Sequence, residues 1–264
     1  MGQVSGGAGG RMRWLACAET EVPSGTGWLS ARETARLDLM RFPKRRTEFL
    51  LRRWTGKRVA AAALGIPAGS TDLSRVELLN HPTGAPYVEI EGSRADIDVS
   101  LTDRAGHAVG LVSPVGTGLG SLGVDLELVE PRSEGFVSDF LTEREAAWVR
   151  SRREEHGEDG WQAGANLVWS AKEAALKVLR VGLRADTRTV EVSVHDDVRD
   201  DGWAPLVVTG ERGARFPGWW RRDGVFVLTI AYAAPHEPPV VMSGGAALER
   251  AVPVHSWLGT PGPV

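Results

Sequence analysis

"LTERE" at Leu141–Glu145 repeats the pattern of "LSARE" at Leu29–Glu33, 112 positions earlier in the chain. In both copies a Ser or Thr stands three residues before a Glu. This is the order of a capping box, in which the hydroxyl and the carboxylate accept hydrogen bonds from backbone N–H groups at the start of a helix. A Trp-x-x-Lys element follows each copy, at Trp54 and at Trp169, 115 positions apart. These near-equal offsets predict a chain of two similar halves.

Both halves also contain segments in which apolar and polar residues alternate, as in half-buried strands. These segments are "RVELL" from Arg75, "DIDVSLT" from Asp96, "GVDLELV" from Gly123, "TVEVSV" from Thr189 and "VFVLTIAY" from Val225. Helices and strands are mixed without the regular spacing of βαβ units. We therefore predict an α+β fold of two pseudo-symmetric subdomains, each a small, largely antiparallel sheet packed with helices.

Composition shifts along the chain indicate the domain boundaries. Residues 1–11 are Gly-rich and polar and are expected to form a disordered tail, and the Pro- and Gly-rich residues 235–264 a poorly ordered one. Between them we predict an N-terminal subdomain at 12–118 and a C-terminal subdomain at 119–234 that contains the metal site. The join falls near the Gly-rich "SPVGTGLGS" at Ser113–Ser121.

The overall composition limits the classes of partner. The formal charge is -3 and 25% of the residues are charged, so the chain as a whole does not attract nucleic acid or anionic membranes. The single cysteine, Cys17, cannot form an internal disulfide. No apolar run approaches the roughly 18 residues of a membrane span, and we expect a cytoplasmic protein.

The segment "SLGVDLELVE" contains two acidic residues on one predicted strand. Asp125 and Glu127 alternate with apolar neighbours, so both carboxylates project from the same face. One interpretation is a strand with a solvated acidic face. The other is a magnesium site, because Mg²⁺ binds one or two carboxylates and completes its octahedron with water and phosphate oxygens.

The segment "WSAKEAALK" at Trp169–Lys177 concentrates lysine in a chain that otherwise uses arginine. Only four of the 31 Lys and Arg residues are lysines, and two of them, Lys172 and Lys177, lie here. Glu173 and Lys177 have the i, i+4 spacing of an ordinary exposed salt bridge. The retained lysines alternatively indicate sites that need a compact point charge.

The segment at Arg41–Arg58, "RFPKRRTEFLLRRWTGKR", is a predicted helix dense in cations with a single acid. It could form a solvated face, bind nucleic acid or hold a phosphorylated small molecule. Nucleic-acid binding is disfavoured because aromatic residues are not interleaved as stacking platforms and the net charge is negative.

Taken in order, these segments resemble the Sfp-type 4'-phosphopantetheinyl transferases from about Trp28 to Tyr232. The specific part of the resemblance is the pair "GVDLE" at Gly123–Glu127 and "WSAKEAALK". The further matching segments are the basic helix "RRTEFLLRRWTGK", "GAP" at Gly84–Pro86, "VSLTDRAGHAV" at Val99–Val109 and "GLRADT" after the lysine-rich helix.

The resemblance implies two similar α+β halves with the active site between them. It implies Mg²⁺-dependent transfer of 4'-phosphopantetheine from coenzyme A to a serine of an acyl or peptidyl carrier protein, giving the holo carrier protein and adenosine 3',5'-bisphosphate. A monomer that serves polyketide or nonribosomal peptide biosynthesis is expected, with no nucleic-acid or membrane partner.

The resemblance also assigns roles to individual residues. Asp125, Glu127 and Glu173 would be the magnesium ligands, with Glu173 also the base that accepts the proton of the carrier serine. The residues expected to bind coenzyme A are Arg46, Arg53, Arg104, Lys172 and Lys177, of which the two lysines would hold the diphosphate and Arg53 with its basic neighbours the remaining phosphate.

Two positions depart from the family pattern. Asp103 stands where the family has a histidine that contacts a coenzyme A phosphate, and Ala85 stands where it has Lys or Arg. Two like charges about 4 Å apart repel by roughly 4 kcal/mol at an effective dielectric near 20. We therefore expect Asp103 to repel that phosphate, and Asp103→His to improve the use of coenzyme A. The alternative is a non-catalytic or diverged member of the fold that binds a carrier protein or synthase.

Overall fold

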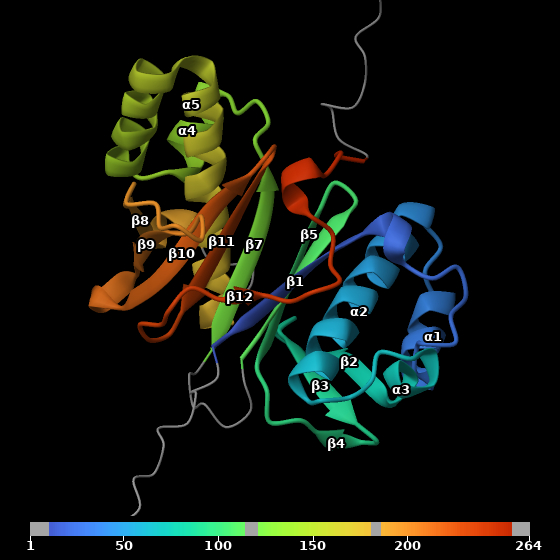
Figure 1. The fold of residues 1–264 in the computed structure, drawn as a ribbon. Helices are drawn as coiled ribbons and strands as arrows, with labels where there is room; N and C mark the ends of the chain where they lie inside the picture. The colour runs from blue at the N-terminus through green and yellow to red at the C-terminus, as the bar shows by residue number, and fades with distance from the viewer. Residues whose placement is uncertain (1–10, 114–120, 181–185, 255–264) are drawn as a thin grey trace, which may run out of the picture.

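The structure is a computed structural model that describes residues 11–113, 121–180 and 186–254. Its helices and strands form the α+β fold that the sequence predicts (Figure 1). Each segment predicted as a strand contains one: β2, β5, β7, β8 and β11, bounded as follows.

The strands of the N-terminal half are β1 (Arg13–Ala18), β2 (Val76–Asn80), β3 (Pro86–Ile90), β4 (Ser93–Arg94), β5 (Val99–Arg104) and β6 (His107–Val112). Those of the C-terminal half are β7 (Leu122–Leu128), β8 (Glu191–Val194), β9 (Ala204–Thr209), β10 (Arg215–Asp223) and β11 (Phe226–Tyr232). The helices are α1 (Ala31–Asp38), α2 (Pro43–Ala63), α3 (Ser70–Arg75), α4 (Glu134–Phe140) and α5 (Glu143–Leu179). The short strand β12 (Val240–Val241) and the 3-10 turns Glu19–Glu21, Thr187–Thr189, Glu211–Gly213 and Leu248–Arg250 complete the described elements.

In each half one long helix packs against antiparallel strands. In the N-terminal half the strand order is β12-β1-β6-β5, with β2-β3-β4 as a separate small sheet, and α2 packs against both. In the C-terminal half the order is β7-β11-β10-β9-β8, and α5 covers one face. Neighbouring strands are antiparallel except β1 and β12, which are parallel. The predicted antiparallel character and the likeness of the halves therefore agree with the structure.

Helix α5 is sharply broken within its length. Gly157 has φ 65 and ψ -151, which is not helical, and the two arms pack against each other. A Cβ at Gly160 would lie 2.2 Å from the carbonyl oxygen of Arg152, so the arms approach closely only because this position lacks a side chain. The second arm, which contains "WSAKEAALK", is thereby placed along β7 and β11.

The two halves meet where β5 lies beside β7, and side-chain hydroxyls join these strands. The Ser100 hydroxyl accepts a hydrogen bond from the Val124 amide at 3.1 Å. The Thr102 hydroxyl accepts one from the Leu126 amide at 3.3 Å. Buried backbone amides require such acceptors, so the small hydroxyl side chains of β5 fix the seam at the acidic strand.

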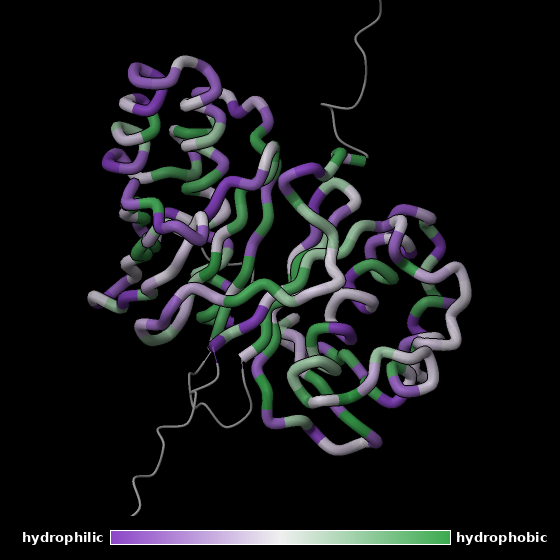
Figure 2. Tube along the Cα trace, in the orientation of Figure 1, coloured by the Kyte–Doolittle hydropathy of each residue, from purple (hydrophilic) through white to green (hydrophobic). Residues whose placement is uncertain are grey.

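A hydrophobic core also crosses this seam. It contains Trp14 from β1, Val109 from β6, and Val124 and Leu126 from β7, all buried. Figure 2 shows the hydrophobic residues concentrated along these central strands. Because the halves share this core, we expect them to fold together.

The first predicted capping box is present and extends into the protein interior. Ser30 caps α1, and Glu33 accepts hydrogen bonds from the amides of Ser30 at 2.9 Å and Leu78 at 3.0 Å. The same carboxylate is ion-paired with Lys57 of α2, whose side chain is fully buried. The other acceptors of this ammonium are the carbonyl oxygens of Trp28 and Leu73, at 2.9 and 3.0 Å. We call this buried glutamate–lysine arrangement a capping lock.

The second capping box forms an equivalent capping lock. Thr142 caps α5, and Glu145 accepts hydrogen bonds from the amides of Thr142 at 2.7 Å and Val192 at 2.6 Å. Lys172, fully buried, lies 2.8 Å from Glu145. Its other acceptors are the carbonyl oxygens of Thr187 and Val190, at 2.9 and 2.7 Å. The repeat in the sequence therefore encodes the same buried ion pair twice.

The capping locks explain why two of the four lysines are not replaced by arginine. Burial lowers the pKa of Lys57 and Lys172, and the partner glutamate opposes that shift in each case. A compact ammonium surrounded by one carboxylate and two carbonyls satisfies its donors in a small space. The wider planar guanidinium of arginine would not fit that pattern.

Residues 235–254 differ from the predicted poorly ordered tail. β12 pairs with β1, the Ala246 amide donates to the Ala16 carbonyl at 2.8 Å, and Leu248 is buried in the core at the seam. The segment ends where the Val254 amide donates to the Ala105 carbonyl at 2.8 Å. Low periodicity misled the prediction because short irregular segments can still be fixed by backbone pairing and single apolar anchors.

Other predictions concern residues that lie outside the ranges described by the structure. These are the N-terminal tail at 1–10, most of the join at 114–120, the first four residues of "GLRADT" and the last ten residues of the chain. Within the described ranges, no helix is long and apolar enough to cross a membrane.

We predict that Lys57→Met lowers the free energy of unfolding by about 3 to 5 kcal/mol, because it leaves the buried Glu33 carboxylate with only the more distant Arg53 as a cation. Urea denaturation measures this loss. Lys44→Met is the matched control, since the Lys44 side chain is 73% exposed and its change should have little effect. The double variant Glu33→Gln/Lys57→Met should recover part of the loss, and equal effects at Lys44 and Lys57 would contradict the role of the capping lock.

Candidate active site

Strand β7 carries its two acidic residues into the protein interior. The predicted alternation is present, with Val124, Leu126 and Leu128 in the shared core. However, Asp125 and Glu127 are only 6% and 9% exposed. The interpretation of a solvated acidic face is therefore wrong, because the second arm of α5 covers that face.

Asp125 is held by three side-chain donors. Its Oδ1 accepts hydrogen bonds from Thr102 at 3.1 Å and from the Lys177 ammonium at 2.8 Å. Its Oδ2 accepts one from the Ser170 hydroxyl at 2.9 Å. Donors from β5 and α5 thus fix this carboxylate at the seam between the halves.

Glu127 is held by one indole and two guanidinium groups. Its carboxylate accepts from the Trp169 indole N–H at 3.1 Å and lies 3.2 Å from Arg104 and 3.5 Å from Arg132. Burial and the neighbouring Asp125 raise the pKa of Glu127 to about 7, and the two arginines oppose the shift. Glu127 is therefore poised between its charged and neutral forms near neutral pH.

Glu173 differs from both because one of its oxygens has no partner among the residues that the structure describes. It is 9% exposed, and its Oε1 is buried without a hydrogen bond to any of them. Burial, followed by the charge of Asp125, raises its pKa to about 7, while Lys177 opposes the shift. An orphaned carboxylate oxygen beside a second carboxylate is the arrangement that a bound cation would stabilise.

The two lysines of "WSAKEAALK" have different roles. Lys177 is 30% exposed along its side chain, donates to the Val124 carbonyl and to Asp125, and lines a cavity of about 200 Å³ with Arg180. Lys172 instead belongs to the second capping lock and is fully buried. The prediction that Lys172 holds a diphosphate does not agree with this geometry, since its ammonium is enclosed and already satisfied.

The carboxylates suit a divalent cation in part. Across the described ranges, no three or more His, Cys, Asp or Glu side chains are grouped so that they could hold a metal ion. Mg²⁺ needs only one or two protein carboxylates, however, and usually retains several waters. Asp125 and Glu173, with the free Glu173 Oε1, meet that requirement, whereas Glu127 faces its arginine partners.

A second cavity, of about 610 Å³, lies in the N-terminal half and is lined by three arginines. We call it the arginine cavity. Its lining residues are Arg36, Met40, Phe49, Arg52, Arg53, Asn80, His81, Pro82, Gly84, Pro86 and Leu101. Arg53 donates to Asn80 at 3.0 Å and lies 3.6 Å from Glu33 of the first capping lock. Burial lowers its pKa to about 10, so it stays charged at neutral pH.

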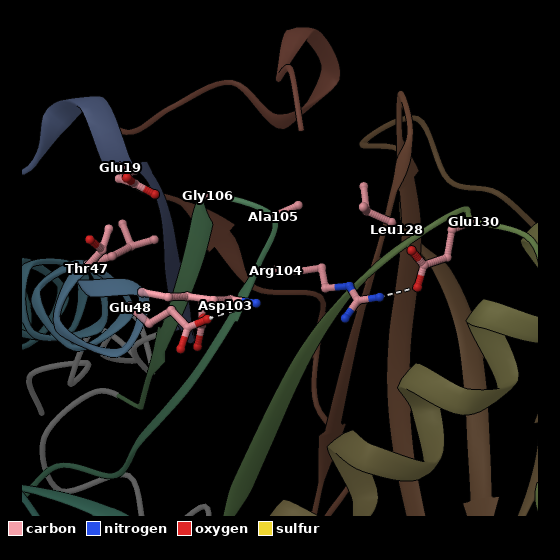
Figure 3. Close-up of a pocket in the computed structure, with 11 residues that line it drawn as sticks. Glu19, Thr47, Glu48, Asp103, Arg104, Ala105, Gly106, Leu128 and Glu130 are labelled. Carbon is pink, nitrogen blue, oxygen red and sulfur yellow. Dashed lines mark hydrogen bonds and ion pairs between the residues drawn. The ribbon is translucent and has the colours of Figure 1, made fainter. Parts of the chain in front are cut away.

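The other arginines predicted to bind a ligand lie elsewhere. Arg46 donates to the carbonyls of Leu37 and Met40 at the end of α1, and it does not line the arginine cavity. Arg104 is ion-paired with Glu127 and Glu130 at the edge of a further cavity of about 240 Å³ (Figure 3). The structure therefore separates Arg46, Arg53 and Arg104 rather than gathering them.

Sequence reasoning missed several residues that hold the site together. Thr102 and Ser170 orient Asp125, and Arg132 and Trp169 hold Glu127. The sequence marks Trp169 through the repeat and the segment "WSAKEAALK", but neither assigns it a role. A Ser or Thr gives no periodic signal, and Arg132 lies in the loop after β7. The roles of these residues depend on contacts between distant segments, which only the structure shows.

Comparison with known proteins finds a family-model match within the C-terminal half. Residues 121–202 match the family model of the 4'-phosphopantetheinyl transferase superfamily. The matched segment begins at β7 and includes all of α5, so it contains Asp125, Glu127, Glu173 and Lys177. The search of curated proteins gives no match.

We predict that Glu173→Gln stabilises the metal-free protein more at high pH than at low pH. The pKa of Glu173 is raised from 4.5 to about 7 by folding, so its ionisation lowers stability progressively as pH rises through that window. Glutamine does not ionise. Relative to the unchanged protein, the variant should gain about 1 to 3 kcal/mol between pH 4.5 and pH 8. Denaturation in a chelator across this range measures the difference, and a pH-independent difference would refute the assignment.

Proposed function

We propose that this chain is an Sfp-type phosphopantetheinyl transferase that uses Mg²⁺ to transfer 4'-phosphopantetheine from coenzyme A to a serine of an acyl or peptidyl carrier protein. The observation that carries the proposal is the buried pair of Asp125 and Glu173 beside Lys177, within the segment that matches the superfamily. A cation site next to a partly exposed ammonium suits the diphosphate of coenzyme A.

Asp125 and Glu173 would hold the magnesium ion, with Glu127 as the further ligand predicted from the sequence. A magnesium ion held there would supply positive charge to neutralise the diphosphate. Lys177 would orient the diphosphate from the exposed end of its side chain, while its bond to the Val124 carbonyl keeps it in place. Lys172 acts at a distance, by fixing α5 through the capping lock.

Glu173 is the proposed base. A carboxylate has two oxygens, so one would bind the metal ion while the other accepts the proton. In the metal-free protein, burial and the charge of Asp125 raise the pKa of Glu173 to about 7. It would accept the proton of the carrier serine as the serine oxygen bonds to the phosphorus of the phosphopantetheine. The bond from that phosphorus to the bridging oxygen then breaks, and adenosine 3',5'-bisphosphate leaves with the bond electrons.

The arginine cavity is proposed to hold the remaining phosphate of coenzyme A, a monoester on the ribose. Arg53 is preorganised there by Asn80 and Glu33. Guanidinium groups suit this task because their planar donors match phosphate oxygens. Action as a monomer and service to a polyketide or peptide synthase remain predictions from the resemblance, and a cytoplasmic location remains a prediction from the composition.

A second candidate is a non-catalytic protein that binds a carrier protein or synthase. The observation in its favour is that Glu127 is occupied by Arg104 and Arg132, which compete with a metal ion. Calorimetry separates the two candidates, because carrier binding without coenzyme A binding would support this alternative.

We predict that the protein, with Mg²⁺ and coenzyme A, adds the mass of one phosphopantetheinyl group to at least one member of a panel of apo carrier proteins. Asp125→Asn should lower the rate by roughly a hundredfold or more, since it removes a proposed metal ligand and the partner of Lys177. Glu134→Gln is the control, because that side chain is 84% exposed. No mass gain on a panel that an authentic transferase modifies would exclude the proposal.

A further inference from the structure

Asp103, the residue expected to repel a phosphate, has a cation of its own. Its Oδ1 accepts a hydrogen bond from Nη1 of Arg52 at 2.5 Å. The pair links β5 to α2, and the Asp103 side chain is 17% exposed while that of Arg52 is 39% exposed. The negative charge at position 103 is thus balanced within the N-terminal half.

The two members of this pair face different cavities. Arg52 lines the arginine cavity, where none of the described lining residues is acidic. Asp103 lines the cavity of about 240 Å³ shown in Figure 3 and is not among the described residues that line the arginine cavity. The acidic residues that line this 240 Å³ cavity are Glu19, Glu48, Asp103 and Glu130. The pair therefore stands at a boundary between a basic cavity and a more acidic one, and Asp103 is outside the space where an anion would bind.

The contact also leaves Arg52 able to bind a second acceptor. A guanidinium carries several N–H donors, and only Nη1 is engaged by Asp103. A long side chain at an exposed position loses rotamer freedom when it binds a ligand. A carboxylate that restrains Arg52 beforehand reduces that loss and aims the free donors at the cavity.

We propose that Asp103 is a positioning residue that holds Arg52 at the wall of the arginine cavity, ready to bind the ribose phosphate monoester of coenzyme A. This inference rests on the proposed function, and it reverses the expectation from the sequence. Asp103→His should weaken the binding of coenzyme A, because it removes the partner of Arg52 and introduces a group that repels it when protonated.

Calorimetry with the full-length protein tests the proposal, using coenzyme A and 3'-dephospho-coenzyme A as probes. Asp103→Asn should weaken coenzyme A binding about fivefold and leave dephospho-coenzyme A binding nearly unchanged. Asp103→Glu should retain most of the affinity. If the variants are active, the loss should fall on KM and not on kcat.

Glu48→Gln is the matched control. Glu48 lines the same cavity as Asp103, and its ion pair is with Lys44, 3.9 Å away. Its substitution removes the same charge, so a purely long-range repulsion predicts tighter binding of coenzyme A by both Glu48→Gln and Asp103→Asn. The positioning role predicts opposite behaviour at the two positions, with weaker binding only for Asp103→Asn.

A double-variant cycle completes the test. Arg52→Gln should reproduce the loss of Asp103→Asn, and Arg52→Gln/Asp103→Asn should show no further loss, with melting temperatures recorded for all variants. Tighter or unchanged binding in Asp103→Asn, equal losses for both probes, or no coenzyme A binding by the unchanged protein would overturn the inference. Binding of coenzyme A without transfer to any carrier would instead overturn the proposed function and leave this inference standing.

Discussion

The buried glutamate–lysine ion pair at the start of each half is the interaction on which the rest of the structure depends. Each capping lock joins a helix start, a strand and a long helix through one carboxylate and one ammonium. Neither charge can be buried alone without a cost of several kcal/mol, so the three segments must assemble together. In the C-terminal half the lysine directly precedes Glu173, and fixing Lys172 therefore fixes the face of α5 that meets the acidic strand.

The same frame carries different chemistry in the two halves. Ser170 and Glu173 of α5 correspond, by the 115-residue offset, to Thr55 and Arg58 of α2. Thr55 and Arg58 meet Cys17 of β1, whereas Ser170 meets Asp125 of β7. Arg58 also donates to the Gly244 carbonyl of the C-terminal segment at 2.5 Å. The repeat in the C-terminal half thus places carboxylates at the seam. In the N-terminal half the guanidinium of Arg58 contacts the Cys17 thiol and holds the C-terminal segment at Gly244.

More of the fold than of the site could be predicted, because the sequence patterns that indicate the helices and strands are local. The capping boxes and the alternating strands are patterns within a few residues, and the offsets between "LSARE" and "LTERE" revealed the repeat. The role of Lys172 could not be predicted, since its acceptors are backbone carbonyls of Thr187 and Val190 that no sequence pattern marks. The surroundings of Asp103 could not be predicted for a related reason. Its ion-pair partner Arg52 stands 51 residues earlier in the chain, and no local sequence pattern marks that contact.

The C-terminal segment has a consequence for the solubility of the protein. β12 occupies the outer edge of β1, whose backbone groups would otherwise face solvent as an open edge. Unpaired edges of this kind invite pairing with a second chain. A protein shortened near Pro235 would lose β12 and the Leu248 anchor together, and it would present both a free edge and an uncovered apolar surface. We therefore expect the segment predicted to be poorly ordered to protect the protein from self-association.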